Sequence, residues 1–467
     1  MTRHSAGDPL DPEIRGSQAD GRRLSIVARV YANLAKIMSG KAAAGLISVA
    51  YMVIAVRVLG ARDYGILILV HGYTVTVGGI IEFPGWQAVV RYGAQAVATG
   101  NSDRMVRLLR LASIVELSCG ALAVLVAALF APMIGERLGW SPQAIAFAVP
   151  YSLAVLATIR SAPAGLLQLH GRFDLLGYQN LVSPVIRLAG ALLAWKMGAG
   201  LLGFLVTWLL AALAEWASMW LLGWAVARQT LPGMRLIGSA RGAIGDNPGI
   251  RRFMLAANAD VTLSELSQRL APLIVGWIMG PIAAALYSVG QRGAVVIAQP
   301  SGNLGQATYA ELAQMLAKGD RGHHLRQVAL RTAGIALALA LPIVILIAVF
   351  GKQIAILIGG KTFAEAGIVM FWLALARAVL LIAPIGTATL VAMGRPGLSV
   401  KANLFCSLLL LPLLPVLIHL DGLAGAGIHA LLTCAAIATT LSVFAWRESR
   451  ALDHELARAS RENERRD

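Results

Sequence analysis

Long apolar runs recur along almost the whole chain, and they constrain the fold more than any other feature. Several run for about 18 residues or more, the length that a helix needs to cross a hydrocarbon core about 30 Å thick. Only 14% of the 467 residues are charged, whereas a soluble domain carries about 25%. The sequence therefore predicts an all-α, polytopic membrane protein.

We predict about twelve transmembrane helices in two six-helix lobes around a central cavity. The longest polar interruption, 228–252, is predicted to be a cytoplasmic linker between an N-terminal lobe, 31–227, and a C-terminal lobe, 253–446. Residues 1–30 are predicted to be a disordered cytoplasmic tail, and 447–467 a second cytoplasmic tail. The predicted spans are 34–58, 64–90, 110–134, 145–169, 177–196, 201–226, 253–279, 282–306, 328–350, 365–392, 399–419 and 423–446.

The distribution of basic residues predicts that both termini are cytoplasmic. With the N-terminus inside, 28 of the 40 Lys and Arg residues fall in inside segments and 6 in outside segments. Cytoplasmic loops of membrane proteins carry such an excess. The net charge of +16 is thus a topology signal, and nucleic acid is not an expected partner.

Prolines and glycines inside the spans predict bends and turns. Pro163 is one of several prolines within spans, and Pro84 with Gly85 predicts a bend in the second span. A weak internal repeat pairs Gly60 with Gly280, each at the outer end of the first helix of its half. The repeat favours two halves of related structure, as alternating access requires.

No cofactor or metal is expected. The three cysteines lie in apolar runs, where they are typical of small buried side chains. The sequence contains no phosphate-binding loop, no metal-ligand motif and no large soluble domain. Direct use of ATP is therefore not expected.

Five short segments resemble the oligosaccharide-flippase branch of polysaccharide biosynthesis proteins, in the superfamily that also contains multidrug and toxin extrusion transporters. They are 55–65 (AVRVLGARDYG), 285–292 (ALYSVGQR), 309–313 (YAELA), 392–396 (AMGRP) and 421–427 (DGLAGAG). The resemblance covers roughly residues 30–446. It implies a flippase that moves a lipid diphosphate-linked oligosaccharide from the cytoplasmic to the periplasmic leaflet of a bacterial inner membrane. The implied partners are undecaprenyl-diphosphate-linked oligosaccharide, membrane lipid, and a polysaccharide polymerase with its chain-length regulator.

Cations within the spans are the candidate substrate-binding residues. A charge at the centre of the bilayer costs about 2.5–3.5 kcal/mol, so it normally faces a cavity or a partner. Arginine remains protonated, and its planar fork of donors suits the oxygens of a diphosphate. The candidates are Arg160, Arg187, Arg269, Arg292, Arg377 and Lys41.

Acidic and polar residues within the spans are candidates for lining the cavity or for ion coupling. Glu215, among three tryptophans, is a possible partner of one arginine, whereas Glu116 lies near the cytoplasmic end of its span and can reach the membrane surface. The seventh span is unusually polar and predicts a cavity wall that hydrogen-bonds sugar hydroxyls. The polar candidates are Asn33, Asn258, Asp260, Ser264, Glu265, Gln268 and Glu215.

The alternative interpretation of these charges is structural: the cations and acids within the spans pair with one another and bind no substrate. Glu265 and Arg269 are spaced four apart and can pair on one helix face. The leading functional hypothesis is a flippase with a cationic cavity, and the alternative is an ion-coupled multidrug exporter that uses Asp260 or Glu265. A membrane-bound polymerase or ligase is disfavoured because no outside loop is long.

Overall fold

The computed structural model describes most of the chain. It covers residues 12–83, 85–231, 238–298, 308, 311–312, 315 and 322–464. The side chains at 12–39, 256–257, 259–268, 296–298, 396 and 455–464 lie outside the description. Within the described residues every regular element is a helix, which confirms the predicted all-α class.

The described residues of the first half of the chain form seven long or medium helices and two short ones. They are α1 (Pro12–Ile81), α2 (Trp86–Ala98), α3 (Ser102–Arg137), α4 (Pro142–Tyr151), the 3-10 helix η1 (Ser152–Thr158), α5 (Ser161–Leu169), α6 (Phe173–Met197), α7 (Leu201–Thr230) and α8 (Ala243–Asp246).

The described residues of the second half form further helices, some of which are separated by short turns. They are α9 (Ile250–Met279), α10 (Pro281–Ala298), α12 (Gly322–Gly359), η2 (Lys361–Phe363), α13 (Ala366–Leu380), α14 (Ala383–Ala392), α15 (Pro396–Leu410) and α16 (Leu413–Glu464).

Helix α1 contains two arms that run in opposite directions. Gly60 has φ 71° and ψ −179°, a backbone region that favours glycine because it lacks Cβ. Tyr51 and His71 both contact the guanidinium of Arg187, although a straight helix between them would be about 30 Å long. The chain therefore doubles back at Gly60. Gly280, its partner in the predicted repeat, has the similar values φ 87° and ψ −179°.

Where the structure describes them, the predicted spans fall on helices, but the second, fourth, tenth and eleventh are each interrupted. The second span is broken between Ile81 and Trp86, where the sequence predicted a bend, and Pro84 itself lies outside the described residues. Helix α1 begins at Pro12, inside the segment predicted to be disordered, since proline suits the first turn of a helix. The end of the eighth predicted span, 299–306, also lies outside the described residues.

Seven helical segments in the described residues are long and apolar enough to cross a membrane. Two of them, Gly40–Ile81 and Leu413–His454, contain the positive-φ glycines Gly60 and Gly422. The fold is that of a multi-pass membrane protein, and the count of twelve crossings stays a prediction.

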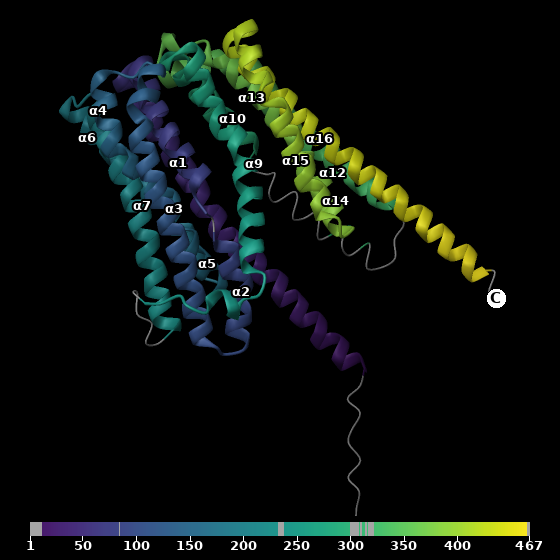
Figure 1. Ribbon diagram of the computed structural model, residues 1–467. Helices are drawn as coiled ribbons and strands as arrows, with labels where there is room; N and C mark the ends of the chain where they lie inside the picture. Colours follow the sequence, from purple (N-terminus) through teal and green to yellow (C-terminus); the bar gives the residue numbers. More distant parts are fainter. Residues whose placement is uncertain are drawn as a thin grey trace, which may run out of the picture.

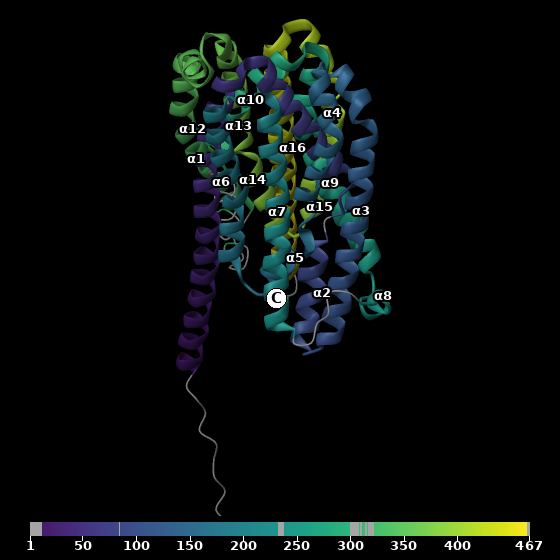
Figure 2. The ribbon, with the colours of Figure 1, turned by 90° about the vertical axis from the view of Figure 1, so that its left-hand side faces the viewer.

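The helices form two groups that meet at one end of the molecule. Figure 1 shows α2–α7 on one side and α12–α16 on the other, diverging toward the end at which α1 begins and α16 ends. Figure 2 shows the start of α1 at the same end after a quarter turn. At the joined end, a Cβ added to Gly65 would lie 1.9 Å from the carbonyl oxygen of Pro281, so α1 and α10 touch through backbone. One hydrophobic cluster runs from α1 into the start of α10 there.

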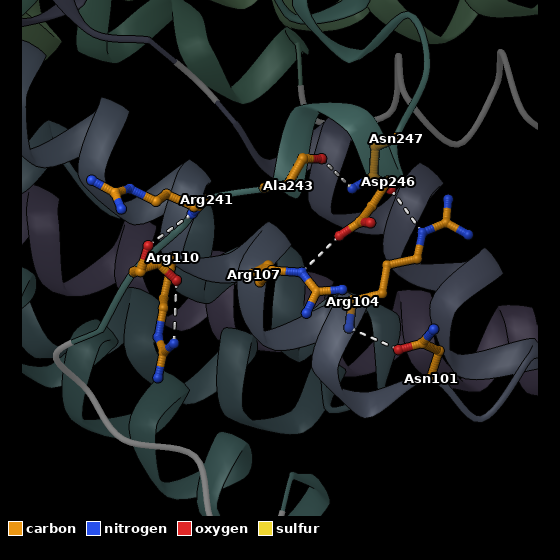
Figure 3. Close-up of polar contacts among 9 residues, drawn as sticks. Asn101, Arg104, Arg107, Arg110, Arg241, Ala243, Asp246 and Asn247 are labelled. Carbon is orange, nitrogen blue, oxygen red and sulfur yellow. Dashed lines mark hydrogen bonds and ion pairs between the residues drawn. The ribbon is translucent and has the colours of Figure 1, made fainter.

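The segment between the two groups is attached to α3. The side chain of Arg107 donates to Asp246 at 2.7 Å, Arg104 donates to Asn247 at 3.0 Å, and Arg110 donates to the carbonyl of Ser239 at 3.3 Å. Figure 3 shows these contacts around α8. Because the three arginines recur every three residues, they lie along one face of α3 and hold the linker against the first group.

Candidate functional site

A polar cavity of about 400 Å³ lies where α9 packs against the first group of helices. Three of the predicted arginines line it: Arg160 from the turn before α5, Arg187 from α6, and Arg269 from α9. The wall also includes His71, Val75, Gly79, Glu82, Trp86, Ala157, Thr158, Ser161, Ala164, Gln168, Glu215 and Met219. We call this space the arginine cavity.

Arg160 is paired with Glu215, as the sequence suggested for one of the arginines. Its guanidinium donates to the Glu215 carboxylate and lies 3.5 Å from the side-chain oxygen of Gln179. Gln179 in turn donates to the backbone carbonyl of Glu215 at 3.2 Å. The pair joins the α5 turn to α7 and leaves about a third of the Arg160 side chain exposed.

Arg160 faces the cavity because the fourth predicted span is broken beside it. Pro163 has no N–H, so it cannot bond the carbonyl of Ile159 as a regular helix would. The indole of Trp220 donates to that carbonyl instead, at 2.8 Å. On the other side of the break, the backbone N–H groups of Ser161 and Ala162 donate to Glu116.

The structure corrects the sequence interpretation of Glu116. The sequence suggested that it reaches the membrane surface, but Glu116 is 1% exposed and both of its carboxylate oxygens accept backbone hydrogen bonds. The first N–H groups of a helix have no partner within the helix. Glu116 supplies that partner from α3 and thereby fixes where α5 begins.

Arg187 is surrounded by aromatic and imidazole groups. Its guanidinium carbon lies 4.5 Å from the centre of the Trp208 ring, close enough for a cation–π interaction. One nitrogen lies 3.1 Å from His71 Nε2 and another 3.5 Å from the Tyr51 hydroxyl. No carboxylate in the described part of the chain forms an ion pair with it, and its buried Nε has no hydrogen-bond partner there.

Arg269 brings a cation from the second half of the chain into the same cavity. It donates to the carbonyl of Val75 on α1 at 3.1 Å. Gly79 leaves the room for it, because a Cβ added there would lie 2.6 Å from Arg269 Nη1. The side chain of Glu265, its predicted partner, lies outside the described residues.

The structure places the other predicted cations elsewhere. Arg377 lines a separate cavity of about 440 Å³ in the second half of the chain, lined by residues of α9, α10, α13, α15 and α16. Arg292 and Lys41 are exposed, and Arg292 lies near enough to Tyr51 and Tyr64 to interact with them electrostatically.

The structure does not describe the side chains of most of the predicted polar residues. The side chains of Asn33, Asp260, Ser264, Glu265 and Gln268 lie outside the described residues. Asn258 is half-buried on α9. Glu215 is the predicted polar residue that the structure places in the arginine cavity.

Sequence reasoning missed three groups at this site. His71 and Tyr51 hold Arg187, yet they come from opposite arms of α1 and share no motif. Glu82 also lines the cavity and accepts from the Ser161 hydroxyl at 3.3 Å. Its position just after the second apolar arm, beside Pro84, was the available signal.

A model of the family described as "Polysaccharide biosynthesis protein" matches residues 53–367, more than half of the chain. The chain belongs to this family. It is also 25% identical over 311 residues to the "Inner membrane protein YghQ" of Escherichia coli (strain K12), with 65% of this chain and 84% of that protein covered.

Solved structures of multidrug transporters share the fold. An inward-facing multidrug resistance MATE family transporter of the MOP superfamily superposes with a TM-score of 0.65 at 15% identity, covering 88% of this chain and 95% of that one. The outward-facing form of such a transporter gives 0.55 at 15% identity, with 91% and 96% covered. The Vibrio cholerae MATE transporter VcmN in the bent form gives 0.54 at 17%, with 92% and 98% covered. Family and fold together support a flippase or transporter role.

Proposed function

We propose that the protein is a flippase that moves a lipid diphosphate-linked oligosaccharide from the cytoplasmic to the periplasmic leaflet of an inner membrane. The observation that carries the proposal is the arginine cavity, in which guanidinium groups from both halves of the chain share one wall. Family membership supports a polysaccharide precursor as the cargo, and the fold supports alternating access.

Of the parts of the cargo, the charged diphosphate is the one that most requires a polar cavity to cross the bilayer. Its charge is costly in a bilayer, and charge-assisted hydrogen bonds from guanidinium groups are strong and directional. Arg187 is best placed to grip it, because aromatic rings and His71 hold the guanidinium without neutralising it. Arg160 adds a second cation, whose guanidinium would leave its partner Glu215 to bond the diphosphate.

The two halves of the chain would release the diphosphate by separating their cations. Arg187 and Arg160 belong to the first group of helices, whereas Arg269 comes from α9 at the start of the second. Rocking of one group against the other changes the distance between these cations. The lipid tail remains in the bilayer while the head group crosses.

The multidrug alternative is not favoured. It was expected to carry cationic drugs, but the cavity presents three arginines against Glu82 and Glu215. Likeness to multidrug transporters at 15–17% identity extends to the fold.

Translocation in proteoliposomes tests the proposal. The substrate is a fluorescent undecaprenyl-diphosphate-linked disaccharide, and its inner-leaflet fraction is measured by the part that dithionite cannot quench. We expect the native protein to accelerate exchange, and Arg187→Gln to slow it by about 10- to 100-fold, since a hydrogen bond to a charged group contributes about 1.5–3 kcal/mol. Arg187→Lys keeps the charge and should retain part of the rate.

Arg137→Gln is the matched control, because Arg137 is an exposed arginine in the last turn of α3 and lines neither cavity. It should exchange lipid at the native rate. Equal rates for the Arg187 and Arg137 variants would refute the cationic-cavity mechanism. No acceleration by the native protein would refute the flippase function itself.

A further inference from the structure

A groove of about 530 Å³ lies on the outer surface of the α12–α16 group, between α16 and the junction of α13 with α14. Figure 1 shows α16 along the edge of this group that faces away from α2–α7. The groove shares no lining residue with the arginine cavity. Its lining on α16 recurs every three or four residues and therefore follows one face of that helix; it includes Ala435, Thr439, Ser442, Val443, Trp446 and Arg450.

The groove is apolar along most of its length and basic at one end. Val443 and Trp446 are each 40% exposed on its α16 wall. Arg447 and Arg450 line the end nearest to the C-terminus, and no Asp or Glu is among the lining residues in the described part of the chain. From Ala435 to Val443 the helix rises about 12 Å, close to the hydrocarbon depth of one leaflet, about 15 Å.

The two arginines at the basic end are available to a ligand. Arg447 and Arg450 are exposed, and neither forms an ion pair with a carboxylate among the residues that the structure describes. The acidic residues beside them on α16 have other partners. Glu448 lies 3.3 Å from Arg395, which precedes α15, and Asp453 lies 3.0 Å from an arginine of α12. The end of the groove thus carries two positive charges that these carboxylates do not pair with.

Trp446 indicates how deep the groove lies in the membrane. The guanidinium carbons of Arg326 and Arg450 lie 5.1 and 5.5 Å from the centre of its ring, within the range of cation–π interactions. Tryptophan is enriched at the membrane–water interface, and the predicted span 423–446 ends at this residue. The apolar part of the groove would therefore lie among acyl chains and Arg447 among lipid head groups.

We propose that this groove binds one anionic phospholipid. Arg447 and Arg450 donate to the phosphate, and one acyl chain lies along the apolar face from Val443 to Ala435. Guanidinium groups suit phosphate oxygens, and basic pockets between transmembrane helices bind the head groups of acidic lipids. The predicted cytoplasmic position of the C-terminus makes this a lipid of the inner leaflet. The site goes beyond the proposed function, because it holds a membrane lipid and does not depend on the cargo.

Native mass spectrometry of the full-length protein in detergent tests this with three probes: phosphatidylglycerol, phosphatidylethanolamine with the same acyl chains, and glycerol 3-phosphate. We expect phosphatidylglycerol to bind most tightly. Arg447→Gln and Arg450→Gln should each weaken it about fivefold, and the double variant about 30-fold. Thr439→Trp fills the apolar part of the groove from an exposed position and should weaken phosphatidylglycerol as well.

Arg228→Gln is the matched control. Arg228 is exposed, and its guanidinium carbon lies 4.6 Å from the centre of the Trp224 ring on α7, away from the groove. The variant removes the same charge from the same kind of arginine–tryptophan pair and should bind phosphatidylglycerol as the native protein does. A loss as large as that in Arg450→Gln would show a response to net charge alone and overturn the proposal.

Three other results would also overturn it. They are equal affinity of the native protein for phosphatidylglycerol and phosphatidylethanolamine, binding of glycerol 3-phosphate as tight as that of phosphatidylglycerol, and native affinity in the double arginine variant. If the double variant does not fold, Thr439→Trp and the single variants decide, and unchanged phosphatidylglycerol affinity in all of them refutes the site. Failure of the translocation assay would refute the flippase and leave this site standing.

Discussion

The buried carboxylate of Glu116 offers a sharp test of how the arginine cavity is built. It accepts the N–H groups of Ser161, in a short contact, and of Ala162 at 2.7 Å. Replacement by alanine leaves both N–H groups without that partner and removes buried volume. Each hydrogen bond to a charged group contributes about 1.5–3 kcal/mol, and loss of a helix N-cap costs about 0.5–2 kcal/mol. We therefore expect Glu116→Ala to destabilise the fold by about 3–5 kcal/mol.

Glu116→Gln separates geometry from charge. The amide keeps the shape and one acceptor oxygen, but its NH₂ faces a backbone N–H that it cannot accept from. We expect about half of the alanine effect, roughly 2 kcal/mol. Unfolding in detergent or bicelles, followed by denaturant titration, measures both variants. Asp103→Asn is the control, because Asp103 lies exposed in the first turn of the same helix.

The reasoning also predicts a loss of transport. Without the cap, the start of α5 is no longer fixed, and Arg160 loses its position opposite Glu215. Exchange of the diphosphate lipid should therefore slow in Glu116→Gln even under conditions in which the variant is fully folded. Native stability in Glu116→Ala, or a loss no larger than that of the Asp103 control, would refute the assignment of Glu116 as the α5 cap.

Two further predictions concern the backbone and the linker. Gly60→Ala should destabilise the fold by about 1–3 kcal/mol, because Gly60 has φ 71° and ψ −179°, a backbone region that essentially only glycine adopts. Gly45→Ala on the same helix should be neutral or stabilising. Neither added Cβ meets an atom within 4 Å, so equal effects in denaturant titration would contradict the strain argument. Arg107 and Asp246 should show a double-mutant coupling of less than about 1 kcal/mol that falls with added salt, since both side chains are about a third exposed. A larger coupling that does not change with salt would contradict the view that this is a solvent-screened surface ion pair.

The sequence was sufficient to predict the helices because a membrane leaves few alternatives. Backbone groups in lipid must be bonded within their own segment, so an apolar run of the right length is almost always a helix. The reversal at Gly60 was also predictable, since a glycine separates two apolar runs there. Pairing of Glu215 with one arginine is confirmed by its contact with Arg160.

The direction in which each arginine points was not predictable. Helix α13 is apolar on nearly all sides, so the sequence contains no stripe to fix its rotation about its own axis. The sequence grouped Arg377 with the other cations because all of them lie within predicted spans, and the structure places it in a different cavity. The role of Glu116 depended on a break in another helix, and a residue that caps a distant helix leaves no local pattern.

Helix α9 lies between the arginine cavity and the cavity that Arg377 lines. Arg269 lines the first of these cavities and Ala271 the second. Two residues on an α-helix are separated by about 200° around its axis, so these side chains face opposite sides. The helix thus separates the two cavities, with a cation on one face and a small residue on the other.

The hydrogen bond from Arg269 to the carbonyl of Val75 attaches α9 to α1. The two groups of helices cannot rock apart through this interface unless that bond breaks or α9 moves with the first group. A diphosphate that attracts Arg269 away from Val75 would loosen the interface, which links occupation of the cavity to motion of the lobes.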